Sequence, residues 1–276
     1  MVLFMAKIKN SMTPSPGFHV GLFATCLVDL MRPAVGFATL KLLEDAGCEV
    51  SVPAAQTCCG QPAYNAGDAK NARTIASQVI ITFEAFDYVV APSGSCAGML
   101  KIHYPALFKN DDDWKQRAET LAAKTFELSS FLIDVLHCES FDASYSAQVT
   151  YHDGCSGLRE LGIKKQPRAL MKKINGLQLT EADEAESCCG FGGLFCMKFA
   201  DVSTHIVDAK IDDALKTKAD VLLGGDLGCL MNIAGRFQRR GLKMQARHFA
   251  EVLSGLHQTT PAIGEEEVET VPGQKL

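Results

Sequence analysis

The sequence predicts an α/β fold built from two homologous α/β repeats with parallel sheets, related by a pseudo-two-fold axis. Apolar strand-like segments alternate with helical patterns along the chain, which is typical of parallel sheets covered by helices. In addition, a cysteine pattern in the order C…CC-G…C occurs twice, and its positions are offset by 129, 130, 130 and 133 residues. A near-constant offset indicates two related half-molecules.

The first half is predicted from apolar runs and helix boundary signals. Pro33 suits the first turn of a helix that ends near Gly47, and Asp68 can cap a helix with an apolar stripe that reaches Phe83. The predicted strands of this half are Val20–Ala24, Glu49–Pro53 and Tyr88–Ala91.

The second half repeats this scheme. Gln148–His152 and Asp220–Leu223 read as strands, Leu177–Thr180 leads towards the second Cys-Cys pair, and Pro167 opens a helix that ends near Gly176. A helix runs through Val202, Ile206, Ile211 and Leu215. A fainter similarity closes each half, between Phe126–Leu136 and Ala246–Leu253.

These elements give the predicted domain organisation. Residues 1–144 form the first cysteine-rich domain and residues 145–257 the second. We expect residues 258–276 to be a disordered tail, because they contain Glu265-Glu266-Glu267 and two prolines.

Eight of the eleven cysteines belong to the repeated pattern, and we call them the ladder cysteines. Each falls at or just after the carboxyl end of a predicted strand or in the loop that follows it, where ligands collect in parallel sheets. The sequence therefore predicts that each half gathers four thiols at one sheet edge. The ladder cysteines are Cys26, Cys58, Cys59 and Cys96 in the first half and Cys155, Cys188, Cys189 and Cys229 in the second.

Composition narrows the class of protein. The chain of 276 residues is long enough for a large core, and its net charge of −5 provides no basic surface for nucleic acid. The N-terminal segment lacks the pattern of a secretory signal, and no apolar run approaches the ~18 residues of a membrane span. We therefore expect a cytoplasmic protein whose odd number of cysteines serves metal or redox chemistry.

Thiolates are soft ligands that suit iron–sulfur clusters and zinc. The glycine after each Cys-Cys pair permits a backbone turn that can bring both side chains to one centre. The chain contains no Cys-x-x-Cys motif. Ser93 and Asp226 stand three residues before Cys96 and Cys229, at the positions that the first cysteine of such a motif would occupy. We therefore regard Ser93 and Asp226 as candidate oxygen ligands.

Other residues near these motifs have simpler interpretations. We interpret Cys48 and Cys138 as bystanders in core or surface positions, and we expect Cys196 not to be a ligand. His152 is interpreted as a histidine satisfied by hydrogen bonds near a strand end.

Several runs resemble a known family. They are QTCCGQPAYNAGD, DYVVAPSGSCAGML, YHDGC with LRELGI, CCGFGG and GGDLGCLM, within residues 18–255. They resemble the cysteine-rich CCG domain found in heterodisulfide reductases and in the iron–sulfur proteins of glycolate and lactate oxidation. Within that group the chain most resembles the lactate utilization protein A family.

The resemblance implies an electron-transfer subunit of a cytoplasmic complex that oxidises L-lactate to pyruvate. The implied partners are a ferredoxin-type iron–sulfur subunit and a third lactate-utilization subunit. Carried over by position, the four ladder cysteines of each half would hold one centre, an iron–sulfur cluster of the [4Fe-4S] type.

Two alternatives stay open. The first is a heterodisulfide-reductase-like thiol/disulfide redox enzyme, against which the missing Cys-x-x-Cys weighs. The second is a scaffold subunit stapled by zinc, because four cysteines also make a normal structural zinc site and zinc in one half fits the sequence.

Overall fold

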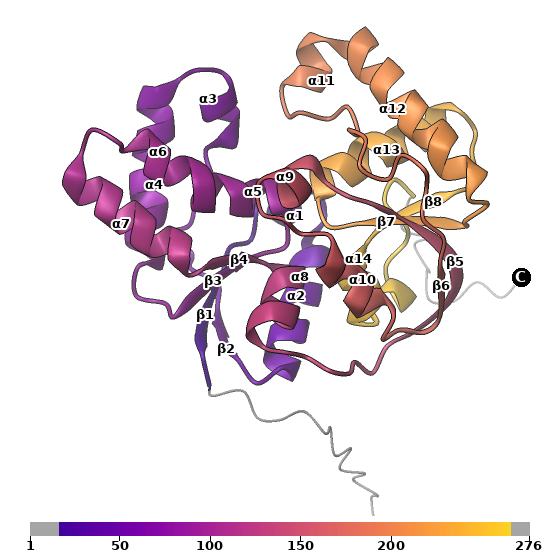
Figure 1. The fold of residues 1–276 in the computed structure, drawn as a ribbon, viewed down its shortest axis with the longest axis horizontal. Helices are drawn as coiled ribbons and strands as arrows, with labels where there is room; N and C mark the ends of the chain where they lie inside the picture. The colour runs from indigo at the N-terminus through magenta and orange to yellow at the C-terminus, as the bar shows by residue number, and fades with distance from the viewer. Residues whose placement is uncertain (1–16, 266–276) are drawn as a thin grey trace, which may run out of the picture.

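The computed structural model describes residues 17–265 and contains two four-stranded parallel sheets (Figure 1). The strand orders are β2-β1-β3-β4 and β6-β5-β7-β8, so the second sheet repeats the topology of the first. The predicted α/β fold with two homologous repeats is confirmed. The strands are β1 (His19–Leu22), β2 (Glu49–Ser51), β3 (Tyr88–Ala91), β4 (Thr125–Glu127), β5 (Ser144–His152), β6 (Asn175–Leu179), β7 (Val221–Gly224) and β8 (Gln245–His248).

The central strands β3 and β7 are apolar because helices cover both faces of each sheet. All four residues of β7 are buried, and in β3 all but Tyr88 are buried. The fourth strands, β4 and β8, overlap the start of the two similar segments that close the halves, and the sequence did not reveal them as strands. They are three and four residues long and, unlike the apolar β3 and β7, contain charged residues such as Glu127 and Arg247.

Short helices follow most strands, and longer ones cover the sheets. The first half contains α1 (Cys26–Met31), α2 (Pro33–Asp45), α3 (Gln61–Asn65), α4 (Ala69–Phe83), α5 (Gly94–Gly98), the π-helical η1 (Met99–His103), α6 (Tyr104–Leu107), α7 (Asp112–Ala123), α8 (Leu128–Ser130) and the π-helical η2 (Phe131–Val135). The second half contains α9 (Cys155–Arg159), α10 (Lys165–Met171), α11 (Phe195–Lys198), α12 (Ala200–Lys216), α13 (Leu227–Arg239), α14 (Phe249–Leu253) and the 3-10 turn η3 (Leu256–Gln258).

The helix predicted to run from Pro167 to near Gly176 is shorter than expected. It begins at Lys165, two residues before the proline, and ends at Met171. Gly176 belongs to β6 instead, with a φ of 82°, and a β-carbon there would lie 2.6 Å from the hydroxyl of Ser146 on β5. The glycine therefore serves close pairing of two strands, not the end of a helix.

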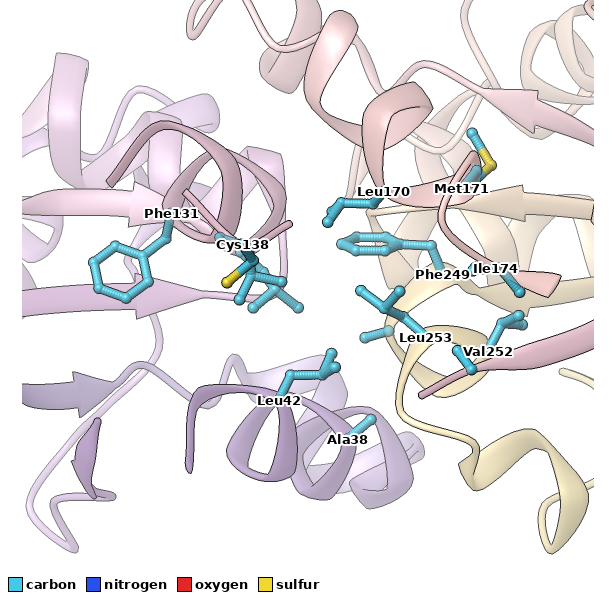
Figure 2. Packing of buried hydrophobic residues seen from close by; sticks show 14 of the residues in the cluster. Ala38, Leu42, Phe131, Cys138, Leu170, Met171, Ile174, Phe249, Val252 and Leu253 are labelled. Carbon is cyan, nitrogen blue, oxygen red and sulfur yellow. The ribbon is translucent and has the colours of Figure 1, made fainter. Parts of the chain in front are cut away.

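A shared apolar core joins the two halves, in addition to a core around the cysteines of each half. Figure 2 shows Ala38 and Leu42 of α2 beneath Val252 and Leu253 of α14, which belong to opposite halves. In the reciprocal contact, α10 of the second half packs on α8 and η2 of the first. This exchange of equivalent helices is what a pseudo-two-fold axis requires.

Near the same axis, α5 lies against α9, in the centre of Figure 1. A β-carbon on Gly94 would come within 2.9 Å of the backbone of Gly157. The two short helices can approach so closely because both residues lack a side chain. Each of these helices carries a ladder cysteine, so this contact brings the two halves together beside their thiols.

Residues 258–265, which the sequence assigned to a tail, pack against the second half. Residues 258–265 are ordered: Ala262 and Ile263 are buried, and the amide of Ile263 donates to the carbonyl of Ala246 at 2.9 Å. The apolar pair Ala262-Ile263 explains this packing. The prediction of a tail rested on the charged run Glu265-Glu266-Glu267 that follows the pair. Residues 266–276 of the predicted tail, and residues 1–16 with the segment searched for a secretory signal, lie outside the described range.

Candidate metal centres

The ladder cysteines occupy the carboxyl ends of the strands, as the sequence predicts. Cys26 and Cys155 are the first residues of α1 and α9, which follow β1 and β5. Cys96 and Cys229 lie in α5 and α13, which follow β3 and β7. The Cys-Cys pairs lie in the loops that leave β2 and β6. Equivalent positions in the two halves therefore carry equivalent thiols.

In the first half, the four thiols are joined pair by pair. The sulfur atoms of Cys26 and Cys58 lie 3.7 Å apart, Cys58 and Cys59 form a hydrogen bond, and so do Cys59 and Cys96. Cys59 and Cys96 are buried, while Cys26 and Cys58 are partly exposed. The thiols thus form a continuous row from the core to the surface.

The protonation of this row shows why it suits a cation. Hydrogen bonds from Cys26 and then Cys59 hold the pKa of Cys58 well below its usual range. The hydrogen bond with Cys58, followed by burial, raises the pKa of Cys26, and hydrogen bonds with Cys58 and Cys96 raise that of Cys59. The site therefore favours one thiolate and resists several, because neighbouring negative charges repel. A bound cation would remove that penalty.

The second half gathers its thiols in the same order. Cys188 forms a hydrogen bond with Cys189, which forms another with Cys229. Cys155 is exposed, and its pKa is raised by partial burial of the thiol and then by the charge of Cys188. The thiols of Cys155 and Cys188 are thus close enough to interact electrostatically. Cys189 and Cys229 are buried, so this row also runs from core to surface.

The glycine after each Cys-Cys pair adopts the left-handed conformation that the sequence suggested. Gly60 and Gly190 have φ values of 80° and 78°. A β-carbon on Gly190 would lie 2.6 Å from the carbonyl oxygen of Ser203, so glycine is required there. The amide of Gly190 also donates to the sulfur of Cys188 at 3.3 Å, which stabilises negative charge on that thiol.

Ser93 and Asp226, the candidate oxygen ligands, are in contact with each other. The Ser93 hydroxyl and the Ser95 amide both donate to the same carboxylate oxygen of Asp226, each at 3.0 Å. The side chains of Ser93 and Asp226 are buried. They are the residues that precede α5 and α13, so the bond links equivalent positions of the two halves. Their role as metal ligands stays a prediction.

His152 is a residue of the site that the sequence did not reveal. It is 1% exposed, and neither ring nitrogen has a hydrogen-bond partner among residues 17–265, so the expectation of a satisfied histidine is wrong. A ring nitrogen and the sulfurs of Cys189 and Cys229 all lie within 4.8 Å of one another. Burial, and then the charge of Lys210, lower the pKa of His152 to about 3, so its ring is neutral at pH 7.

The remaining three cysteines have other surroundings. Cys48 and Cys138 are buried in the shared core between the halves. Cys196 lies in α11, and its thiol donates to the carbonyl of Gly193 at 3.1 Å. These positions agree with the interpretation of Cys48 and Cys138 as bystanders.

The donor sets fit a metal group. None of the eleven cysteines, all of which fall within residues 17–265, forms a disulfide, and soft sulfur donors converge from several elements in each half. In the second half, two of these donors lie beside a buried imidazole that has no protein partner within the described chain. A buried polar group without a partner is costly, and a bound metal would satisfy it.

Comparison with known proteins agrees with this arrangement. A family model described as a cysteine-rich domain (CCG) matches residues 20–101 and again residues 149–234. The fold and the paired thiol rows therefore define a duplicated CCG cysteine-rich protein. The chain belongs to the lactate utilization protein A family.

Relatives with that name cover most of the chain. Lactate utilization protein A of Geobacillus sp. (strain WCH70) is 49% identical over 235 residues, which make up 85% of this chain and 98% of the relative. The protein of the same name from Anoxybacillus flavithermus is 48% identical over 236 residues, 86% of this chain and 99% of the relative. The resemblance noted from the sequence is thereby confirmed.

A solved structure supports the fold. A hypothetical protein from Helicobacter pylori matches 92% of this chain with a TM-score of 0.64 and 12% sequence identity. The match spans 51% of that protein, so this chain corresponds to about half of its length. In the present chain, no helix between residues 17 and 265 is long and apolar enough to cross a membrane.

Proposed function

We propose that this chain is an iron–sulfur electron-transfer subunit of a cytoplasmic complex that oxidises L-lactate to pyruvate. The observation that carries the proposal is the pair of thiol rows, one per half, in a chain of the lactate utilization protein A family. The lack of any disulfide among residues 17–265 agrees with a reducing compartment.

The residues would act by holding and shielding the clusters. Cys26, Cys58, Cys59 and Cys96 would hold one centre, and Cys155, Cys188, Cys189 and Cys229 the other. A bound cluster of this kind accepts and releases single electrons. The buried thiols in each row exclude water from one side of the centre, while the exposed thiols leave its other side accessible.

Access from outside supports a role in electron transfer between subunits. A surface hollow beside the first centre is lined by Cys26 and Cys58 together with Leu30 and Val52, which are 77% and 49% exposed. Exposed apolar side chains around a redox site are typical of protein contact surfaces. We propose a ferredoxin-type iron–sulfur subunit and a third lactate-utilization subunit as the partners.

Zinc in the second half is a second candidate, favoured by one observation. A histidine nitrogen beside two cysteine thiols is a common ligand combination of structural zinc sites. In that case the metal of the second half would only stabilise the fold, and the centre of the first half alone would carry electrons.

The test is metal and sulfide analysis of protein purified without exposure to air. We expect brown protein that contains iron and acid-labile sulfide. Cys59→Ala should remove the first centre and Cys189→Ala the second, each leaving the EPR signal of the other. Iron-free protein loaded with zinc would contradict the electron-transfer function.

The control is Cys196→Ala, which removes a thiol close in sequence to Cys188 and Cys189. Because the Cys196 thiol donates a hydrogen bond to the carbonyl of Gly193, this variant should keep the full metal content. Loss of metal from Cys196→Ala, or retention of both centres in Cys59→Ala and Cys189→Ala, would overturn the ligand assignment.

A further inference from the structure

The two centres differ at one buried position. His152 lies three residues before Cys155, and its equivalent in the first half, three residues before Cys26, is Phe23. Phe23 is fully buried and packs in the same apolar cluster as Cys59 and Cys96. The first half thus has an apolar ring where the second half has an imidazole.

The surroundings of His152 do not explain an imidazole by packing alone. Its position at the end of β5 places it inside the protein, 1% exposed, and both ring nitrogens are unpartnered within the described chain. Phe23 shows that the fold accepts an apolar ring at this point, which would avoid the cost of two unpaired polar atoms. An imidazole there therefore needs a bonding partner for its ring nitrogens.

Two buried thiols beside the ring indicate that this partner is a metal ion. A ring nitrogen of His152 and the sulfurs of Cys189 and Cys229 lie within 4.8 Å of one another, which is within reach of one metal ion bonded at about 2.0–2.3 Å to nitrogen and sulfur. Each of the three side chains comes from a different segment: the end of β5, the loop after β6, and α13.

We propose that His152 is a nitrogen ligand of the second centre, beside the thiolates of Cys189 and Cys229, and that the two centres are therefore chemically unequal. This inference rests on the proposed function only in that the second half must bind a metal group. It assigns a ligand outside the repeated cysteine pattern, at a position where the two halves differ.

The nitrogen ligand gives the second centre a different chemistry. An imidazole is neutral when it binds a metal, whereas each thiolate adds a negative charge, so His152 in place of one of the four thiolates would lower the negative charge of the centre. In iron–sulfur proteins histidine ligation raises the reduction potential. If the second centre is such a cluster and His152 takes the place of one thiolate, that centre accepts electrons more readily than the first, and electrons within the chain run from the first half to the second.

The experiment uses the full chain with Cys59→Ala, so that metal signals come from the second centre. Protein labelled with ¹⁵N-histidine is purified without air, and two measurements are made: X-ray absorption at the edge of the metal found, iron or zinc, and pulsed EPR of a reduced iron centre. We expect imidazole scattering at the metal edge and, for iron, a ¹⁵N coupling. His152→Phe, which copies the first half, should abolish both.

Two further variants complete the test. His205→Phe, at an exposed position of α12, should keep the nitrogen signals. His152→Gln should lose them while keeping a polar side chain, and it replaces His152→Phe if that variant fails to fold. In both His152 variants, a chelator should remove the metal of the second centre about tenfold faster or more.

The outcomes separate this inference from the proposed function. Metal in the Cys59→Ala protein without imidazole scattering, or nitrogen signals that survive His152→Phe or His152→Gln, would overturn the ligand role of His152 alone. Cys59→Ala protein that binds neither iron nor zinc would overturn the second metal centre and this inference with it.

Discussion

At the scale of single residues, the two neighbouring cysteines of each pair have different environments. Cys59 and Cys189 are each 3% exposed, whereas Cys58 is partly exposed and Cys188 is exposed. Adjacent residues of a regular strand would point to opposite faces. The left-handed glycine after each pair turns the chain, so that the two thiols form a hydrogen bond although one is buried and its neighbour lies near the surface.

Gly190→Ala tests this turn. Alanine would adopt a φ of 78° only with strain and would place its β-carbon 2.6 Å from the carbonyl of Ser203, so we expect a loss of about 2–3 kcal/mol in the free energy of unfolding. Urea denaturation of the metal-loaded protein measures it. Gly193→Ala is the matched control, because its φ of 63° is also left-handed but no atom lies within 4 Å of its β-carbon. Equal losses in the two variants would show that the close contact with Ser203 has no effect.

The sequence predicted those residues whose position depends on nearby residues in the chain. The ladder cysteines follow from the repeat and the strand ends, and the glycine turn follows from the motif itself. The sequence did not reveal the unpartnered state of His152 or the bond between Ser93 and Asp226. Both depend on segments more than thirty residues apart in the chain, and no local pattern shows which side chain will meet which.

At the scale of elements, caps and buried ion pairs fix the helices. Asp68 caps α4, as predicted, by accepting from the amide of Asn71 at 3.1 Å. Arg32 stands between α1 and α2 and donates to Glu251 of α14 at 2.8 Å. Glu251 is fully buried and completes a capping box with His248. The ion pair therefore ties the helices of the first half to α14 of the second.

Arg32→Met should destabilise the protein by about 3 kcal/mol, because it leaves the buried carboxylate of Glu251 without its cation. Thermal or urea denaturation measures the change. Lys41→Met, which removes the exposed Lys41–Asp45 pair, should cost less than about 1 kcal/mol. The double variant Arg32→Met with Glu251→Gln should recover part of the loss, and similar effects of Arg32→Met and Lys41→Met would contradict the role of burial.

Most long elements were predictable because their apolar positions are periodic, as in α4. The helix α7, from Asp112 to Ala123, escaped prediction because only three of its residues are buried and its sequence is polar. Its start is nevertheless capped by Asp111, whose carboxylate accepts from the amide of Trp114. Boundaries such as that of α10 also depend on how the chain returns to its sheet, which the sequence alone does not show.

At the scale of the whole molecule, the halves share a core. The predicted boundary at residue 144 coincides with the first residue of β5, yet α2 and α14 pack together across it. A unit with such a core is expected to unfold cooperatively. The division into two domains thus describes the repeated topology, while the packing joins the repeats.

Leu42→Ala should destabilise both halves together. Leu42 is 2% exposed in the shared core, and its truncation should cost about 2–5 kcal/mol. Trp114, the single tryptophan, reports on the first half, and release of metal from a Cys59→Ala background reports on the second. Both transitions should shift to lower urea by the same amount.

The control is Ile81→Ala on α4, where the side chain is 51% exposed and the cost should stay below about 1 kcal/mol. A shift of the tryptophan transition without a shift in metal release would show that the halves unfold independently.

The hydrogen bond between Ser93 and Asp226 joins equivalent positions across the pseudo-axis, and it needs two different residues there. In a symmetric pair of separate, identical subunits, whatever residue stood at this point would face its own copy. Two aspartates would repel each other, and two serines would lack an ionised acceptor. Because the two positions belong to one polypeptide and are encoded separately, one side carries the hydroxyl and the other the carboxylate. The same freedom lets Phe23 and His152 differ at equivalent positions, so one chain with two repeats can hold two unequal sites.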